Sequence, residues 1–465
     1  MYVFFHDNKS LQYKLGLNIP QKNSRDNTFI IYLKEDLENN YDYYSTKISI
    51  VDIPKDDPNF RESKSLSSDG LIVNKIIIKK IYCLFDINTY KELNLDITKN
   101  EYIIDLACKY NNMEFLNWWI NSDYNLTYSN EAIDNACRKG HINILNWWIS
   151  SGLEIKYSSD AIDYACEKGK LDVLNWWISQ NLPLKYTKRS IKKALVNGHI
   201  NILEWWINSS LKMIYPNNPL DKICKNNHYD LLLWWYEQGL PLKYSVKVLY
   251  FCENIKIYDW WCKSGLQILY DECTLDLASI YGNIKLLDWW LESGLELKYS
   301  NKSIDELYQF DHSLDVLNWW HKSGLKMKYS EDAIDMLYSK DKCKILDWWF
   351  NSGLELKYSE DAIDNICSTG DIEVLQQWEK SGFPFKLSKK YIMYAFENCN
   401  IDVLNWFLNS NLPFEFDSVE LSNMFQKNPK KYYKVMKWVK ENIHTIYENL
   451  LGKFVKSEHC IDISG

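Results

Sequence analysis

The 465-residue sequence lacks the features that mark several common classes of protein. Its 54 lysines and arginines face 62 aspartates and glutamates, so it has no basic excess for phosphate-dominated nucleic-acid binding. It has no apolar run of about 18 residues, which a membrane-spanning helix requires. The opening MYVFFHDNKS has neither the charged nor the long apolar segment of a secretory signal peptide. We therefore expect a cytoplasmic protein that binds neither nucleic acid nor membrane.

Motifs for metal, phosphate and catalytic chemistry are missing as well. The 12 cysteines form no Cys-x-x-Cys pair, and no two of the 8 histidines stand at the spacing of metal ligands. No glycine-rich loop follows a strand, and no Ser, His and Asp set stands out as a catalytic group. These absences predict a protein without an active site, a metal or a cofactor.

Tryptophan, in contrast, is abundant and regularly spaced. Adjacent Trp-Trp pairs begin at residues 118, 147, 176, 205, 234, 260, 289, 319 and 348. Single tryptophans at 378, 406 and 438 continue the series, which takes up all 21 tryptophans of the chain. Most intervals between the pairs are 29 residues, with one of 26 and one of 30. A fixed period between about 20 and 50 residues indicates a solenoid of repeats.

One repeat, beginning at residue 158, reads SSDAIDYACEKGKLDVLNWWISQNLPLKY. Its serines and first aspartate predict a helix N-cap with an acid in the first turn. Ile162, Ala165 and Cys166 then share one helical face. Gly169 ends that helix, because glycine tolerates the left-handed conformation of a helix C-terminus, and a second helix begins at Leu171. Each repeat is therefore predicted to be a helix, a tight turn, a second helix and an extended return.

This pattern resembles the ankyrin repeat over roughly residues 98–445. GLEIK, residues 152–156, corresponds to that family's Gly-Ala-Asp-Val-Asn stretch, DAID at 160–163 to its Thr-Pro-Leu-His, and the Gly-His pair at 140–141 to its turn. The period is 29 residues rather than the family's about 33, so the projecting hairpin tip is expected to be shortened or absent. The Trp-Trp variant looks most like the ankyrin-type proteins of giant DNA viruses, such as mimivirus.

The resemblance implies a mostly α fold, an ankyrin-like α-solenoid of about 11–12 helix-turn-helix repeats. Ahead of it, residues 1–97 contain short β-rich runs such as TFIIYL and KISIVDI, which predict a small β-rich module. The repeats are assigned to residues 98–416, a degenerate C-terminal capping repeat to 417–450, and a tail to 451–465.

The tryptophan pairs have a structural interpretation. Neighbouring helical residues point about 100° apart, so Trp147 and Trp148 cannot present both rings to one ligand. We expect one ring to contact the first helix of its own repeat and the other to contact the neighbouring repeat. The alternative, an aromatic platform for sugars, lacks a nearby set of polar groups.

Three further residue types recur at fixed places in the repeat. Five cysteines that share one position predict small buried side chains: Cys108, Cys137, Cys166, Cys224 and Cys367. The histidines His141, His199 and His228 share a turn position. An aspartate in most repeats, such as Asp134 and Asp163, is expected to accept hydrogen bonds from an indole or from the return loop.

The resemblance further implies a non-enzymatic scaffold or adaptor that binds another protein on its concave surface. The partner is expected to be a host protein, in the host cytosol if the source is viral, and the chain to be a monomer. Variable side chains on the first helices are the candidate contacts: Asn135, Arg138, Tyr164, Glu167, Lys193, Lys222 and Lys225.

Beside these helices runs a regular series of lysines in the return loops, represented by Lys298, Lys328 and Lys357. They either attract an acidic partner or solvate the loop and pair with nearby aspartates. Two other functions remain open at this stage. One is a substrate adaptor of a ubiquitin ligase, and the other is a helical-toroid glycosidase, which needs two carboxylates that stand apart from the repeat.

Overall fold

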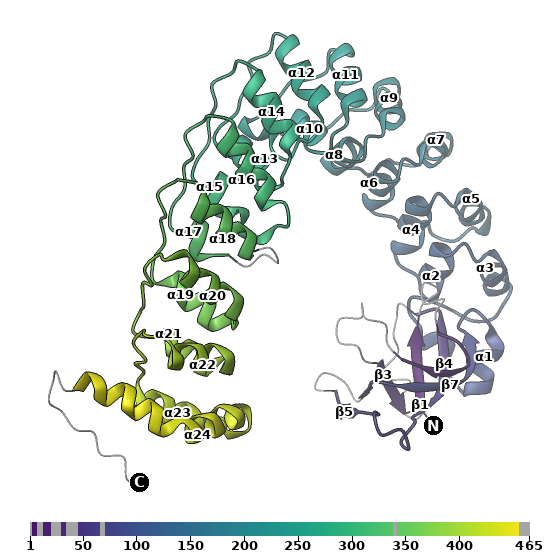
Figure 1. The fold of residues 1–465 in the computed structure, drawn as a ribbon. Coiled ribbons are helices and arrows are strands. Elements are labelled where there is room, and N and C mark those ends of the chain that lie inside the picture. Colours follow the sequence, from purple (N-terminus) through teal and green to yellow (C-terminus); the bar gives the residue numbers. More distant parts are fainter. Residues whose placement is uncertain are drawn as a thin grey trace. The chain divides into compact units, whose positions relative to one another are not determined.

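The computed structural model describes residues 2–6, 13–19, 29–33, 45–65, 70–337 and 342–454. Residue contacts divide the chain into two compact halves, Met1–Lys243 and Tyr244–Gly465. Strands occur at the start of the first half, and helical repeats follow them (Figure 1). The predicted boundaries at residues 97, 416 and 450 remain predictions.

The N-terminal strands form one antiparallel sheet in the order β2-β7-β4-β1-β3-β6-β5. Their bounds are β1 (Tyr2–His6), β2 (Gly16–Asn18), β3 (Phe29–Leu33), β4 (Lys47–Asp52), β5 (Glu62–Lys64), β6 (Leu71–Val73) and β7 (Ile76–Cys83). Alternate residues of β3, such as Phe29 and Ile31, are buried with Val51 and Ile78 in one apolar cluster, as the two-residue period of a strand requires. The predicted β-rich module is confirmed.

Pairs of helices fill the rest of the N-terminal half. After α1 (Ile87–Leu93) and the short η2 (Ile97–Lys99), the first helices of the repeats are α2 (Ile103–Lys109), α4 (Glu131–Lys139), α6 (Asp160–Glu167), α8 (Lys188–Asn197) and α10 (Pro219–Lys225). The second helices are α3 (Met113–Ile120), α5 (Ile142–Ser151), α7 (Leu171–Ser179), α9 (Ile200–Asn208) and α11 (Tyr229–Glu237). Neighbouring first helices contact each other more extensively than neighbouring second helices do. The row of first helices is therefore the more tightly packed side of these repeats.

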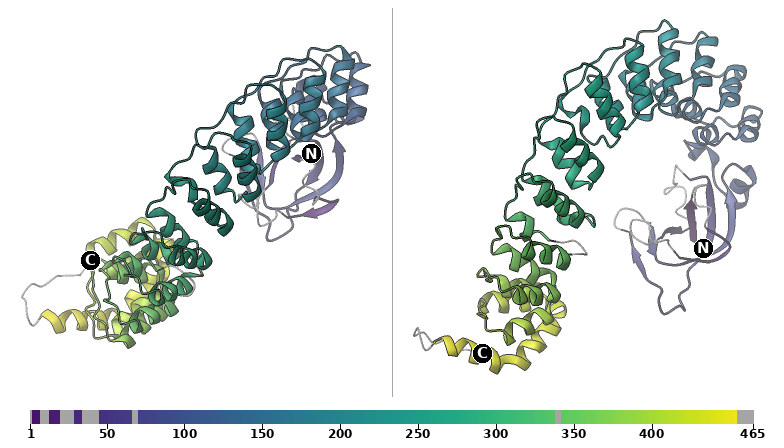
Figure 2. Two further views of the ribbon diagram at one scale, coloured as in Figure 1. Left: turned by 90° about the horizontal axis from the view of Figure 1, so that it is seen from above. Right: turned by 45° about the horizontal axis from the view of Figure 1, so that its top comes forward.

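The C-terminal half continues the alternation. Its first helices are η3 (Val246–Leu249), α13 (Cys273–Ile280), α15 (Lys302–Asp305) with η4 (Glu306–Gln309), α17 (Asp332–Asp335), α19 (Asp361–Thr369), α21 (Tyr391–Glu397) and α23 (Ser418–Lys427). Three of them, η3, α15 and α17, are only 4 residues long. The second helices are α12 (Ile255–Lys263), α14 (Ile284–Glu292), α16 (Ser313–Lys322), α18 (Lys342–Asn351), α20 (Ile372–Ser381), α22 (Ile401–Asn409) and α24 (Pro429–Phe454). The views in Figure 2 show successive helix pairs stacked within each half. The predicted helical solenoid is confirmed.

The two irregular intervals of the tryptophan series correspond to irregular first helices. The 26-residue interval contains η3, a single 3₁₀ turn in place of an α-helix, and the 30-residue interval contains α15 and η4. At the other end of the chain, α24 continues past residue 450 to Phe454, so the first residues of the predicted tail are helical. The rest of that tail lies outside the described residues.

The turns between the helices use left-handed backbone, as the glycines predicted. Gly169 has a φ of 66°, and Asn111 and Cys399 take the same role with φ near 60°. Gly169 is also constrained by packing, because a Cβ there would lie 3.0 Å from the ring of His199. The Nε2 of His199 in turn donates to the carbonyl oxygen of Glu167, at 3.0 Å. Where the repeat has this histidine, it therefore joins its turn to the first helix of the preceding repeat.

The recurrent aspartate joins its own first helix to the start of the next repeat. Asp134 in α4 accepts two hydrogen bonds from Ser158, one from its backbone N–H at 3.1 Å and one from its hydroxyl at 2.6 Å. The Ser158 hydroxyl itself accepts from the N–H of Asp160 and so supports the first turn of α6. We call this pairing the Asp–Ser clamp. It recurs at Asp105–Ser129, Asp163–Thr187, Asp276–Ser300, Asp305–Ser330, Asp335–Ser359 and Asp364–Ser388.

Both tryptophans of a pair contact the preceding repeat. Trp177 is fully buried, and its indole Nε1 lies 3.4 Å from the Cys137 sulfur in the preceding first helix. Trp176 donates to Asn146 Oδ1 in the preceding second helix, at 2.8 Å. In this pair each indole N–H bonds one repeat back, whereas Trp119 and Trp235 donate to carbonyl oxygens of their own repeats. The expectation that one ring packs on the first helix of its own repeat stays a prediction. A sugar platform is not supported, since both rings of this pair are buried.

Candidate protein-interaction surface

Four first helices of the N-terminal half carry the predicted partner-binding residues on their solvent side. In α6, Ala161, Ile162 and Ala165 face the core, and the partly exposed Tyr164 and Glu167 lie on the opposite side. The same division applies to α4, α8 and α10. We call this row of solvent-facing side chains the first-helix surface. Its members are Asn135, Arg138, Tyr164, Glu167, Lys193, Lys222 and Lys225.

An aromatic ring at the centre of this surface joins three helices. The Arg138 guanidinium of α4 lies 4.7 Å from the centroid of the Tyr164 ring in α6. Arg189 of α8 lies 5.9 Å from the same ring and bonds Asp160 with an N–O distance of 3.0 Å. Guanidinium groups within about 6 Å of a ring are attracted by its negative face. Tyr164 is therefore held between cations from the two neighbouring repeats.

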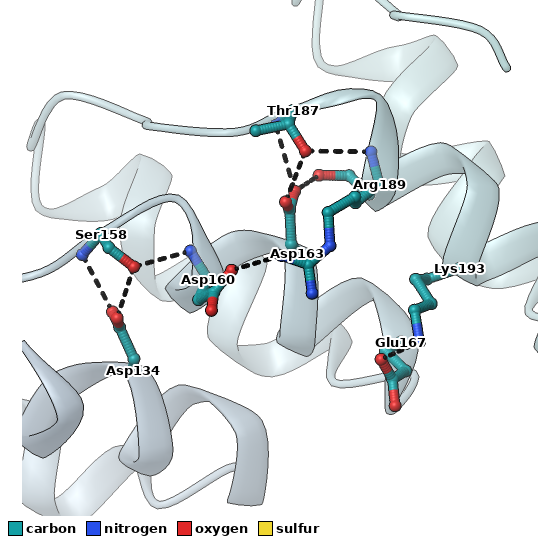
Figure 3. A network of polar contacts seen from close by, with 9 residues as sticks. Asp134, Ser158, Asp160, Asp163, Glu167, Thr187, Arg189 and Lys193 are labelled. Carbon is teal, nitrogen blue, oxygen red and sulfur yellow. Dashed lines mark hydrogen bonds and ion pairs between the residues drawn. The ribbon is translucent and has the colours of Figure 1, made fainter.

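A second contact lies one helical turn further along the same surface. Lys193 of α8 bonds Glu167 of α6 at 2.8 Å (Figure 3). Lys168 lies 3.0 Å from the same carboxylate. The hydrogen bond from Lys193 lowers the pKa of Glu167 below its ordinary value. Glu167 is consequently ionised at neutral pH and presents fixed charge rather than a titrating group.

The structure thus brings Arg138, Tyr164, Glu167 and Lys193 together across three repeats. Asn135 stays within its own helix, where its side-chain amide donates to Glu131 at 2.7 Å. Lys222 and Lys225 continue the surface on α10, one repeat beyond Lys193.

Sequence reasoning missed Arg189 and Asp160, which belong to the same surface. The signal was available, because the two opposite charges stand 29 residues apart, one period of the repeat. Equivalent residues of adjacent repeats are neighbours in a solenoid, so charges of opposite sign one period apart predict an ion pair.

The return-loop lysines occupy a different environment. Lys298, Lys328 and Lys357 lie over the rings of Tyr270, Tyr299 and Tyr329, at 4.8, 4.4 and 4.8 Å from the ring centroids. Lys328 also donates to the Tyr299 carbonyl oxygen at 2.7 Å.

These contacts differ from the expected pairing with aspartates. The acid beside Lys298 is Glu296, at a long 3.9 Å. Each lysine therefore takes part in packing its loop on the preceding one, whether or not it also meets a partner.

Within the described part of the chain, no group of three histidine, cysteine, aspartate or glutamate side chains could hold a metal ion. None of the helices described there combines the length and the apolar character that a membrane crossing needs.

Comparison with known proteins adds two likenesses, and no family model matches the chain. It is 33% identical over 78 residues to "Uncharacterized protein L696" of Acanthamoeba polyphaga mimivirus, a match that covers 16% of this chain and 24% of that protein. A human solved structure, the ASB11 ankyrin repeat domain, matches 47% of this chain and 97% of its own length at 15% identity, with a TM-score of 0.27. A TM-score of this size establishes no common fold, so the solenoid architecture rests on the helices and turns described above. The chain is therefore a solenoid of helix-turn-helix repeats with a short stretch of similarity to a mimivirus protein.

Proposed function

We propose that this protein is a non-enzymatic scaffold or adaptor that binds another protein on the first-helix surface. The observation that carries the proposal is the Arg138–Tyr164–Arg189 contact across α4, α6 and α8. Tyrosine and arginine are enriched among the side chains that dominate protein–protein binding energies. Here they are already ordered by contacts between repeats, so little conformational entropy is lost when a partner binds.

The charges of the surface suggest the chemistry of the partner. On α8 and α10 the basic residues Lys188, Arg189, Lys192, Lys193, Lys222 and Lys225 are accompanied by the acid Asp221 alone, which is buried. An acidic segment of a protein partner matches this region, and its association is expected to weaken with salt. We propose a host protein of the cytosol as the partner and a monomeric state for the chain.

Affinity capture from host cells tests the proposal with three versions of the full chain. The test variant is Arg138→Ala, Tyr164→Ala and Arg189→Ala combined. The matched control is Asp172→Ala with Glu204→Ala, two exposed residues on the second helices α7 and α9. We expect the control to retain the wild-type partner and the test variant to lose it, with both variants folded by circular dichroism.

Equal capture by all three versions contradicts the assignment of the surface. Capture of a ubiquitin-ligase core that survives in the test variant favours the ligase-adaptor function, with a different part of the chain as the docking site.

A further inference from the structure

A dense group of lysines lies at the last helix of the chain. Residues 427–440, which run from the end of α23 into α24, include six lysines and no aspartate or glutamate, although the net charge of the chain is −8. The expectation that the chain binds no membrane came from its overall charge and from the lack of a long apolar run. Neither of these describes a local surface. The six are Lys427, Lys430, Lys431, Lys434, Lys437 and Lys440.

One face of α24 packs on the preceding helices. Tyr432, Val435 and Trp438 recur every three residues and are buried. The Trp438 indole N–H donates to Asn405 Oδ1 of α22 at 2.7 Å, and its ring centroid lies 6.3 Å from that of Phe396 in α21. These contacts fix the rotation of the helix about its axis, so its opposite face is held toward solvent.

The solvent-facing side of α24 combines positive charge with large apolar side chains. Exposed residues recur there at the three- and four-residue spacing of one helical face, and they are Lys430, Tyr433, Lys434, Lys437 and Lys440. Tyr433 is 68% exposed, and Met436, at the edge of the same side, is 38% exposed. We call these five side chains, together with Met436, the α24 face.

The lysines of the α24 face are less neutralised than those of the first-helix surface. In the first-helix surface, Lys193 bonds Glu167 at 2.8 Å. On the α24 face, Lys437 has Glu441 at a long 3.7 Å. The other lysines of the face have no ion-pair partner among the described residues. Because like charges on one face repel each other, a negatively charged surface that neutralises them is attracted.

The exposed apolar side chains favour a lipid surface as the source of that negative charge. A membrane presents anionic headgroups above an apolar boundary, so lysines can meet the headgroups while Tyr433 and Met436 enter between them. Tyrosine is enriched at this depth because its ring is apolar and its hydroxyl is polar. The phosphate backbone of a nucleic acid would neutralise the lysines but would give Met436 no apolar contact.

The shape of the α24 face also favours a flat partner. The face belongs to the outermost helix of the stack in the C-terminal half (Figure 1). The outer side of a single helix is convex, whereas a bound peptide commonly takes a groove or the edge of a sheet. A membrane needs neither, because it lies across the helix as an extended surface.

We propose that the α24 face binds the surface of a membrane that contains anionic lipids. Groups of about four to eight lysines or arginines on an amphipathic helix are typical of such binding. Because the whole chain carries a net charge of −8, its acidic surfaces are repelled, and the α24 face determines which side meets the lipid. The first-helix surface consists of other residues, so this inference does not depend on the protein-binding function.

Vesicle flotation tests the proposal with the full chain. One set of vesicles contains phosphatidylcholine with about 30% phosphatidylserine, and the other contains phosphatidylcholine alone. We expect the wild-type chain to float with the anionic vesicles and not with the neutral ones, and to be released as the salt concentration rises. Failure to bind the anionic vesicles overturns the proposal, whether or not a nucleic acid or an acidic protein binds the face instead.

Charge reversal tests the location. Lys430→Glu, Lys434→Glu and Lys437→Glu are combined in one variant, whose fold is checked by circular dichroism because all three side chains are exposed. Each lysine near an anionic membrane contributes roughly a fivefold factor, so this variant should bind at least about a hundredfold more weakly.

The matched control makes the same change of charge elsewhere. Lys188→Glu, Lys192→Glu and Lys225→Glu reverse three exposed lysines of α8 and α10. Salt screens charges over about 10 Å, so this control should bind anionic vesicles within about threefold of wild type. A similar loss in both variants would show that vesicle binding follows the net charge of the chain, which overturns the assignment to α24.

A third variant separates a lipid surface from other anions. Tyr433→Ser with Met436→Ser keeps every lysine and removes the exposed apolar side chains. We expect about tenfold weaker binding to the anionic vesicles, since less apolar surface leaves water. Unchanged binding would mean that the face responds to charge alone and would contradict insertion into lipid.

Discussion

The regular repeats of the N-terminal half and the short repeat that begins the C-terminal half both use a side-chain hydrogen bond to join a first helix to the start of the next repeat. They place the donor and the acceptor on opposite sides of that junction. In the regular repeats, Asp134 accepts hydrogen bonds from Ser158. In the short repeat, Tyr250 occupies the aspartate position and Asp271 occupies the serine position, so the donor and the acceptor are exchanged. The comparison shows that the repeat preserves a hydrogen bond across the junction rather than the identity of the residue at each end.

The buried tryptophans also differ between the regular repeats and the short repeat, in the hydrogen-bond partner of the indole N–H. Trp148, Trp177 and Trp206 each have the indole N–H 3.4 Å from a cysteine sulfur, and Trp320 has it 3.0 Å from the Ser279 hydroxyl oxygen. Trp290 contacts Tyr258 of the short repeat, and its indole nitrogen finds no partner in the described part of the chain. The ring is buried in every case, so burial is the constant feature and the hydrogen bond is the variable one.

The largest effect is expected from truncating these rings. Trp177→Ala should lower the free energy of unfolding by about 3–5 kcal/mol, measured by urea denaturation, because a fully buried indole leaves a cavity. Trp290→Ala should cost about 0.5–1.5 kcal/mol less, since no hydrogen bond is lost. Ile178→Ala, at a 44% exposed position of α7, is the control. Equal losses for the two tryptophans would show that the indole–cysteine contact contributes nothing.

The next largest effect concerns the Asp–Ser clamp and the Tyr250–Asp271 hydrogen bond that replaces it in the short repeat. Asp134→Ala leaves the N–H and the hydroxyl of Ser158 without their acceptor and should cost about 1–3 kcal/mol. Tyr250→Phe removes one donor, while Asp271 keeps its bond from Cys273, so about 0.5–1.5 kcal/mol is expected. Chemical denaturation of both variants measures the difference. A more costly Tyr250→Phe would mean that the exchanged pair is the stronger junction.

Hydrogen exchange should distinguish the two regions directly. Residues 246–258 contain one 3₁₀ turn and part of a second helix, whereas residues 131–180 contain four complete α-helices. We expect exchange in 246–258 to be about tenfold faster, because a single turn has few internal hydrogen bonds to protect it. Uniform protection would indicate that the hydrogen bonds of Tyr250 and Tyr258 compensate fully for the missing helix.

The smallest effect is a pH dependence. Burial raises the pKa of Asp134 to about 6, so the folded chain binds this proton more tightly than the unfolded chain does. Stability from this group is therefore present at low pH and is lost as the pH rises through about 6. Between pH 7 and pH 6 the free energy of unfolding should increase by a few tenths of a kcal/mol. Asp134→Asn should remove this increment in matched thermal unfolding scans, and an unchanged increment would assign it to other groups.

Much of the fold could be predicted because the same residue pattern recurs in most repeats. The tryptophan spacing predicted the helix pairs, and the recurrent aspartate predicted an acceptor for the return loop. The exchange of roles at Tyr250 and Asp271 could not be predicted, since the alignment of a shortened repeat depends on which turn is missing. The Tyr164 contacts could not be predicted either. The variable residues of the first helices indicate which positions face solvent but not which side chains contact one another.

The cysteines that contact the indoles of Trp148, Trp177 and Trp206 have a chemical consequence. Burial raises the pKa of the Cys108 and Cys166 thiols to about 12, which suppresses the thiolate that alkylating reagents and oxidants attack. Cys83, Cys262 and Cys273 are exposed and should be modified at once. Each buried thiol then reacts only when its own repeat opens. The labelling rate of each buried cysteine should therefore report how often its own repeat opens.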